Sequence, residues 1–333
     1  MAKPHQNSHA QATSRRLFLC RSAAAAAATL VVTPGERPAA QVSIEGRDLS
    51  KDKRPVLHAD GSKFGCYDPY GDFKDDRRVA TEQLFLPWED VELSTLPAAD
   101  EYSFARGRKV LVTIEPWSWS QDWNVSPFEL RNLILSGRRD ENLQAICRVL
   151  ANFRSPLIIR WAQEMENPSG RFTWANWPAK DYIAAYKRMI DIVRAMLPNA
   201  QIMWSPKGEK NLQNYYPGDD YLDIVGLSVF GLEAYDMIEF RRPRSFAEIL
   251  KQGYDLSAGY GKPIWVAELG YEDGLQYVAK WVQEATLSYP EFPQLKEVNY
   301  FNHKEVWPWP HNLGLPDWRV VRDKPTYPAR EAK

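Results

Sequence analysis

Two glutamates in this chain stand where apolar, β-branched runs end. Glu164 follows the run 156–161, and Glu268 closes the run 262–268 just before Gly270. In a barrel of parallel strands the carboxyl ends of the strands face the substrate, so we expect both side chains at one mouth. Retaining hydrolysis of a glycosidic bond requires two carboxyl groups about 5–5.5 Å apart, one as acid and base and one as nucleophile. The pair therefore predicts glycoside hydrolysis.

The two roles require different surroundings. A nucleophile must be ionised, so we expect positive or hydrogen-bond-donating neighbours around Glu268. A general acid must hold its proton, so we expect a drier site or a nearby negative charge around Glu164. The alternative for each is a structural strand-end carboxylate, which for Glu164 would pair with Arg160.

Strand-like and helix-like segments alternate from about residue 50 to the end. This alternation predicts an α/β fold, a (β/α)₈ TIM barrel. The alternative is a doubly wound open sheet, which usually carries a G-x-G-x-x-G turn that this sequence lacks. The expected strands are 63–68, 83–86, 109–115, 156–161, 201–205, 222–227, 262–268 and 298–301, and the expected helices are 142–152, 180–197, 245–254 and 275–287.

Four segments resemble the glycoside hydrolase family 26 barrels of the 4/7 clan. Residues 160–165, R-W-A-Q-E-M, are similar to that family's acid/base segment R-x-x-H-E-M-N. Residues 216–226, Y-P-G-D-D-Y-L-D-I-V-G, resemble its signature Y-P-G-D-x-Y-V-D-x-V-G, and 264–270 resemble its nucleophile strand; 113–117 also have a counterpart. The resemblance runs from about 64 to 301. It implies a β-mannanase or β-glucanase type of barrel with Glu164 as acid/base and Glu268 as nucleophile.

The chain also departs from the family pattern. Gln163 replaces the histidine before the acid/base, and an amide cannot titrate. Glu166 stands where asparagine is common. The tyrosine expected near the nucleophile is absent from 227–230, so we expect Ser228 or Tyr235 to substitute for it. These changes leave the reaction class standing and weaken the transfer of mannan specificity.

Further side chains are predicted to bind substrate. Arg160 is expected to orient a catalytic carboxylate from inside the barrel, and the resemblance implies Trp307 as the aromatic under the sugar at the cleavage point. The alternative is a structural ion pair for Glu115 and core packing for each tryptophan. The predicted substrate-binding set is Tyr67, Asp68, Glu115, Trp117, Arg160, Gln163, Trp174, Trp177, Phe230 and Trp307.

The amino-acid composition limits the classes of molecule that this protein is expected to bind. The 42 basic and 43 acidic residues nearly balance, so nothing suggests nucleic acid. The 13 Trp, 16 Tyr and 13 Phe suit a polysaccharide partner, whose C–H groups pack on aromatic faces. The sequence contains no metal-binding motif and no G-x-S-x-G elbow. Catalysis by two carboxylates requires no cofactor. We expect a monomer without a membrane anchor.

The first residues read as an export signal. Residues 14–19, S-R-R-L-F-L, resemble the twin-arginine motif, and the Ala-rich run 23–32 is too short to span a bilayer. The alternative is an accidental Arg pair. We expect a signal peptide and disordered leader at 1–45, a single catalytic domain at 46–333, and a periplasmic or secreted protein. Cys66 and Cys147 are expected to be free, buried thiols.

Taken together, the residues predict an exported, retaining endo-β-glycosidase. Its substrate would be a β-linked polysaccharide such as β-glucan, mannan or the producer's own exopolysaccharide. Two alternatives stay open. A non-catalytic carbohydrate-binding barrel would not need both glutamates, and a transglycosylase would use the same residues and differ only in its products.

Overall fold

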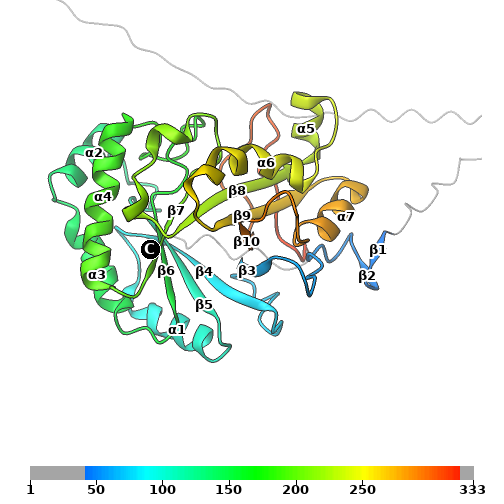
Figure 1. The fold of residues 1–333 in the computed structure, drawn as a ribbon, viewed down its shortest axis with the longest axis horizontal. Helices are drawn as coiled ribbons and strands as arrows, with labels where there is room; N and C mark the ends of the chain where they lie inside the picture. Colours follow the sequence, from blue (N-terminus) through cyan, green and yellow to red (C-terminus); the bar gives the residue numbers. More distant parts are fainter. Residues whose placement is uncertain (1–41, 323–333) are drawn as a thin grey trace, which may run out of the picture. The chain divides into compact units, whose positions relative to one another are not determined.

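Eight parallel strands close into a barrel with helices around it (Figure 1). The structure, a computed structural model, describes residues 42–322. The strands follow one another around the barrel in chain order, and the last pairs with the first. They are β3 (Lys63–Tyr67), β4 (Val79–Pro87), β5 (Lys109–Glu115), β6 (Leu157–Trp161), β7 (Gln201–Trp204), β8 (Ile224–Leu232), β9 (Ile264–Glu272) and β10 (Leu295–Phe301). The predicted (β/α)₈ barrel is confirmed.

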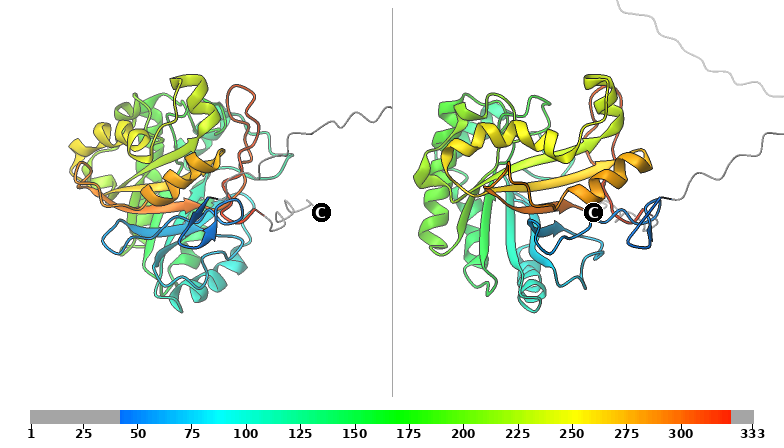
Figure 2. Two further views of the ribbon diagram at one scale, coloured as in Figure 1. Left: turned by 90° about the vertical axis from the view of Figure 1, so that its right-hand side faces the viewer. Right: turned by 45° about the vertical axis from the view of Figure 1, so that its right-hand side comes forward.

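Helices cover the outside of the strands, as the two turned views show (Figure 2). They are α1 (Leu96–Phe104), α2 (Pro127–Leu135), α3 (Asp140–Leu150), α4 (Ala179–Met196), α5 (Glu233–Phe240), α6 (Phe246–Ser257) and α7 (Leu275–Glu284). Short 3₁₀ turns are η1 (Leu93–Thr95), η2 (Leu212–Tyr215), η3 (Asp219–Tyr221) and η4 (Ala258–Tyr260). α4 buries the stripe that includes Tyr182, Tyr186 and Val193, as its apolar spacing predicts.

Three helices escape the sequence prediction, each for a local reason. α2 depends on its start, where Ser126 accepts from the Glu129 N–H and Pro127 takes the first position. α1 and α5 bury few residues, so they lack an apolar stripe. In α5 only Asp236 is buried, while Met237 and Phe240 are exposed.

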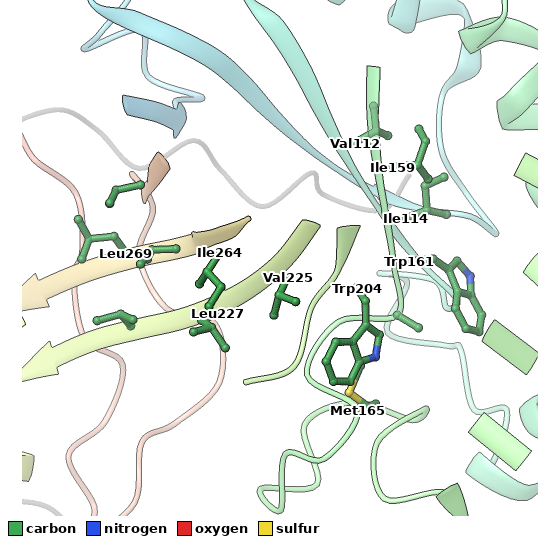
Figure 3. Close-up of a cluster of buried hydrophobic side chains, with 14 of the residues drawn as sticks. Val112, Ile114, Ile159, Trp161, Met165, Trp204, Val225, Leu227, Ile264 and Leu269 are labelled. Carbon is green, nitrogen blue, oxygen red and sulfur yellow. The ribbon is translucent and has the colours of Figure 1, made fainter. Parts of the chain in front are cut away.

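The core has two parts. Inside the barrel lies one apolar cluster, and outside it a larger cluster packs strands against helices. Figure 3 shows part of the outer cluster, including Val112, Ile159 and Val225 on three strands. The inner cluster consists of Leu111, Ile158, Met203, Ile224, Trp265 and Ala267.

Polar side chains replace apolar ones inside the barrel toward the carboxyl ends of the strands. Side chains alternate between the two faces of a strand, so the residue two positions later also points inward. Thr113, Arg160 and Ser205 each follow an inner apolar residue by two positions, and all three are buried. On β5, β6 and β7 an apolar layer of the barrel interior is therefore followed by a polar layer at the carboxyl end, which prepares that end for chemistry.

The described chain begins with a small hairpin, β1 (Ser43–Ile44) and β2 (Arg47–Asp48). Ile44 and Leu49 of this segment are buried. The expected leader boundary at residue 45 falls inside this hairpin, and the predicted signal segment lies outside the described residues. Cys66 and Cys147 are free and buried, as predicted. No helix within residues 42–322 is long and apolar enough to cross a membrane.

Candidate active site

Glu164 lies in a tight loop that directly follows β6. Ala162 and Glu164 both have left-handed backbone conformations, with φ of 48° and 54°. This region costs a residue with a side chain about 1–2 kcal/mol. Two hydrogen bonds hold the loop: the Glu164 N–H donates to the Ser205 carbonyl at 2.8 Å, and the Trp174 indole donates to the Gln163 carbonyl at 2.6 Å. Backbone strain supported from neighbouring elements is typical of functional sites.

The Glu164 carboxyl is held by neutral donors. The Ser228 hydroxyl donates to one oxygen at 2.5 Å, and the Asn167 side-chain amide donates to the other at 2.7 Å. The carboxyl is nearly buried, at 7% exposure. Arg160, its partner in the structural alternative, pairs with Glu268 instead.

Glu268 lies within β9 and not at its end, so the predicted end of that strand at 268 is wrong. β9 continues to Glu272 because Leu269 and Tyr271 resume the alternation and pair with β8. A β-bulge stands at this point: Val266 pairs with Leu227, and the next pair is Glu268 with Ser228, which leaves Ala267 unpaired. A bulge changes the direction of a side chain relative to its neighbours. Here Ala267 joins the inner cluster, and Glu268 contacts Arg160 inside the barrel.

Arg160 and Glu268 form a buried ion pair. The Arg160 Nη1 donates to Glu268 Oε1 at 2.7 Å, and Arg160 is fully buried. Burial raises the pKa of Glu268 above the usual glutamate value and the nearby Glu164 adds to this, whereas Arg160 and Arg171 lower it. The expected contact between Arg160 and a candidate catalytic carboxylate is therefore present.

Ser228 brings the two carboxyl groups together. Its backbone pairs with Glu268 across β8 and β9, and its hydroxyl donates to Glu164. Tyr235 does not reach this point; its ring packs against Trp309 with centroids 5.5 Å apart. Of the two residues expected to replace the family's tyrosine, only Ser228 touches a candidate catalytic group, and it touches the acid/base candidate.

Glu115 is the hydrogen-bond centre of the neighbouring strand end. Its carboxylate accepts from the Gln163 amide at 2.7 Å and from the indoles of Trp117 at 2.9 Å and Trp119 at 2.8 Å. The structural alternative of an ion pair is not what the structure shows, because these three donors are neutral. Gln163 therefore anchors the acid/base loop to the end of β5. Trp119 was not predicted.

Comparison with known proteins places part of the chain beside a known family. Residues 137–250, which include the acid/base segment, match the family model described as "Glycosyl hydrolase family 26". Over these residues the chain is similar to glycoside hydrolase family 26, which confirms the predicted resemblance.

Similar proteins come from both sequence and structure. The chain is 28% identical over 109 residues to the beta-1,3-xylanase TXYA of Vibrio sp, covering 31% of this chain and 22% of that protein. A beta-1,3-xylanase of Alcaligenes sp is 25% identical over 104 residues, covering 29% of this chain and 21% of that protein. The chain thus spans about a fifth of the length of these curated relatives.

Solved family 26 structures share the fold. The beta-mannanase BoMan26A of Bacteroides ovatus superposes with a TM-score of 0.54 at 18% identity, covering 81% of this chain and 86% of that one. A Cellulomonas fimi endo-beta-1,4-mannanase gives a TM-score of 0.57 at 16% identity, covering 72% and 65%. At these identities the likeness concerns the fold alone.

Two predicted sugar platforms lie in the core of this family 26-like barrel. Trp174 is fully buried and Trp177 nearly so. Trp174 stacks on Phe172 with centroids 4.7 Å apart, and Trp177 donates its indole N–H to the Thr173 carbonyl at 2.8 Å. A sugar ring cannot stack on a face that is already packed, so the predicted platform role of these two residues is wrong. Trp174 instead holds the loop of Glu164, through its bond to the Gln163 carbonyl.

A cavity of about 600 Å³ opens beside Glu164. Predicted residues Phe230 and Trp307 line it, and Trp307 is 40% exposed, so its ring is open to a ligand. Arg171 and Lys207 also line it and were not predicted. Both lie in loops without a regular pattern, so the sequence offers no signal for them.

Arg171 brings positive charge to the mouth. It pairs with Glu305 at 3.0 Å, and the carboxylates of Glu305, Glu164, Glu268 and Glu115 raise its pKa against the effect of burial. The guanidinium is therefore charged and in the field of both candidate catalytic groups.

Tyr67 and Asp68, at the end of β3, make contacts within the protein. Asp68 accepts from the N–H groups of Asp72 at 3.0 Å and Phe73 at 2.7 Å, so its carboxylate closes the loop after β3. Tyr67 packs against Phe85 and Phe301, with centroids 5.0 and 5.4 Å away. Neither lines the cavity beside Glu164. The predicted substrate-binding role gains no support from Asp68, because its carboxylate already accepts from this loop and from the Asn302 amide at 2.8 Å.

Glu166 holds the loop that follows β7. Its Oε1 accepts from the N–H groups of Gly208 at 2.9 Å and Glu209 at 3.2 Å. Burial raises its pKa to about 7, while the backbone donors, Gly208 first, oppose the rise. Gly208 has φ of 109°, a conformation that a side chain would strain. Within residues 42–322 no cluster of His, Cys, Asp and Glu could hold a metal ion.

Proposed function

We propose that this barrel is a retaining endo-β-glycosidase with Glu164 as acid/base and Glu268 as nucleophile. The observation that carries the proposal is the link through Ser228, which brings two nearly buried carboxyl groups into one site at the carboxyl end of the strands. The family match supports the same reaction class. Two carboxyl groups with different partners are what double displacement requires.

The hydrogen-bond partners of Glu164 and Glu268 differ, and this difference assigns their catalytic roles. Arginine can only donate hydrogen bonds, so the Arg160 bond favours the ionised form of Glu268. The Ser228 hydroxyl can either donate or accept, so it tolerates a proton on Glu164. Burial and the nearby Glu164 raise the pKa of Glu268, and Arg160 opposes that rise, so in this proposal Arg160 keeps Glu268 ionised for attack. Glu164 is then assigned the proton transfer to the leaving oxygen.

The reaction then follows from these positions. Glu164 protonates the departing glycosidic oxygen while Glu268 attacks the anomeric carbon and forms a glycosyl-enzyme. Glu164, now ionised, takes a proton from water, and the water oxygen displaces Glu268. Arg160 neutralises Glu268 when it leaves. Gln163, held by Glu115, presents an amide beside the acid/base where a histidine stands in the family pattern.

The substrate proposed is a β-linked polysaccharide. Relatives include two beta-1,3-xylanases, and solved neighbours include beta-mannanases. Gln163 and Ser228 depart from the family pattern at the catalytic groups, which favours a polymer other than mannan. β-1,3-Xylan, mixed-linkage β-glucan and the producer's exopolysaccharide are therefore tested beside β-1,4-mannan.

The test measures reducing ends released from these polymers by purified protein. Glu268→Ala is the inactive variant, and Glu291→Ala, which removes an exposed glutamate, is the matched control. We expect release from at least one polymer that is lost in Glu268→Ala and kept in Glu291→Ala. Undiminished release by Glu268→Ala would refute the nucleophile. Binding of a polymer without any release would establish the carbohydrate-binding alternative, and longer products would establish transglycosylation.

We also propose that the protein acts outside the cytoplasm, since residues 14–19 resemble a twin-arginine motif. Fractionation of cells that express the full chain tests this. We expect mature protein in the periplasm or medium, and retention in the cytoplasm when Arg15 and Arg16 are both changed to Lys. Equal export of that variant would contradict the twin-arginine route.

A further inference from the structure

Trp119 is an exposed aromatic side chain that is nevertheless held in one orientation. It is 54% exposed, more than any other tryptophan in the described part of the chain. Its indole N–H donates to Glu115 Oε2 at 2.8 Å. Because the bond fixes the edge of the ring, the exposed face is presented to solvent at a set angle.

The anchor is rigid. Glu115 is 5% exposed and also accepts from Trp117 and Gln163. The loop itself is braced, because the Ser118 hydroxyl donates to Asp90 at 2.9 Å and accepts from the Ser120 N–H at 2.8 Å. A ligand that stacks on Trp119 would therefore lose little conformational entropy of the protein.

Its place in the barrel sets Trp119 apart from the cavity. Trp119 follows β5, Glu164 follows β6, and Lys207 follows β7, which is the order of these strands around the barrel. Trp119 does not line the 600 Å³ cavity, whereas Lys207 and Trp307 do. The acid/base candidate thus lies between an exposed indole on one side and an aromatic-lined cavity on the other.

We propose that Trp119 is the stacking platform of a separate sugar subsite, on the side of Glu164 away from the cavity. The ligand is a pyranose ring of the substrate chain, whose C–H face packs on the indole. This inference rests on the proposed function and deepens it, because a substrate held on both sides of the scissile bond is cleaved internally. Glu115 ties the platform to Gln163, next to the acid/base.

The test separates binding from turnover by using the Glu268→Ala background. Migration of each variant is measured in native gels that contain increasing amounts of the polymer that the wild-type protein hydrolyses. Trp119→Ala is expected to weaken binding by roughly ten-fold, the size of one aromatic contact. Trp119→Phe keeps a ring without the anchoring N–H, so an intermediate loss is expected.

Phe104→Ala is the matched control. Phe104 is 47% exposed at the end of α1, which leads into the start of β5 at the opposite end of the barrel. Binding by this variant and the melting temperatures of all variants should stay at the level of the background protein. In the active protein, Trp119→Ala should also shift the lengths of the first products released.

The outcomes are distinct. Unchanged binding and products in Trp119→Ala, with hydrolysis by the wild type, would overturn the platform and leave the proposed function standing. An equal loss in Phe104→Ala would show a general surface effect and would also overturn it. No hydrolysis and no retardation of the wild type by any polymer would overturn both proposals.

Discussion

Replacing Glu166 with glutamine tests how the loop after β7 is held against the acid/base loop. Glu166 is buried, and its pKa rises from 4.5 to about 7. The folded state then holds the proton more tightly than the unfolded chain does. Its contribution to stability is fully present below about pH 4.5 and is lost as the pH rises through about 7. Glutamine has the same shape and cannot titrate, so the variant lacks this loss.

The size of the effect follows from the pKa. Each pKa unit corresponds to about 1.4 kcal/mol, so the rise amounts to about 3 kcal/mol in the free energy of unfolding. Other groups with raised pKa values, such as Glu268 and Glu82, titrate in both proteins and cancel in the difference. Relative to Glu166→Gln, the wild-type protein should therefore lose about 3 kcal/mol between pH 4.5 and pH 7.5.

Urea unfolding at half-unit steps over this range measures the difference. Glu291→Gln, an exposed glutamate, serves as the control and should show no pH-dependent difference from the wild type. A difference that does not vary with pH, or one that favours the wild type as pH rises, would refute the reasoning. It would mean that Glu166 is already ionised in the folded protein at low pH.

Three further predictions concern the site and its support. Arg160→Gln removes the charge that lowers the pKa of Glu268, so the acidic limb of kcat/KM should move upward by roughly 1–3 pH units; an unmoved limb would separate Arg160 from the nucleophile. Ser228→Ala removes a donor from Glu164 at 2.5 Å, so kcat should fall by about ten-fold with little change in KM, and the opposite split would mark Ser228 as a substrate ligand. Trp174→Ala should lower the free energy of unfolding by about 3–5 kcal/mol, measured in urea; a loss of polymer binding at unchanged stability would return Trp174 to a platform role.

Much of the barrel could be predicted because its strands are short, β-branched and bounded by turn residues. The run 109–115 coincides with β5, and 201–205 with β7 to within one residue. The inward position of Arg160 also follows from strand alternation, since Ile158 is in the inner cluster. Parallel strands then bring Glu164 and Glu268 to the same end of the barrel, which the sequence predicted because each glutamate stands near the end of a strand-like run.

The rest depended on contacts between distant segments. Trp174 and Trp177 stand among polar residues in a loop, as an exposed platform would, but the loop folds back and buries both rings. Trp119 stands in a similar setting and stays exposed, with its indole N–H bonded to Glu115. Nothing in the local sequence separates the two cases. The segment 216–226, which the sequence singled out, has a structural role. The Tyr216 ring stacks on the Tyr260 ring with centroids 3.9 Å apart and holds the chain that enters β8.

The bulge in β9 has a consequence for comparing this chain with others. Val266 and Glu268 are consecutive in their pairing with β8, so Ala267 is a residue that no neighbouring strand matches. Val266 points outward and Glu268 points inward. If Ala267 were deleted, these two residues would become neighbours and the regular alternation of β9 would continue through them, so every other side chain would keep its present face. A protein with one residue fewer before its glutamate can therefore build the same wall of the site. When sequences are aligned here, the gap belongs at position 267, and the number of residues between the strand core and the glutamate is not itself a mark of the reaction.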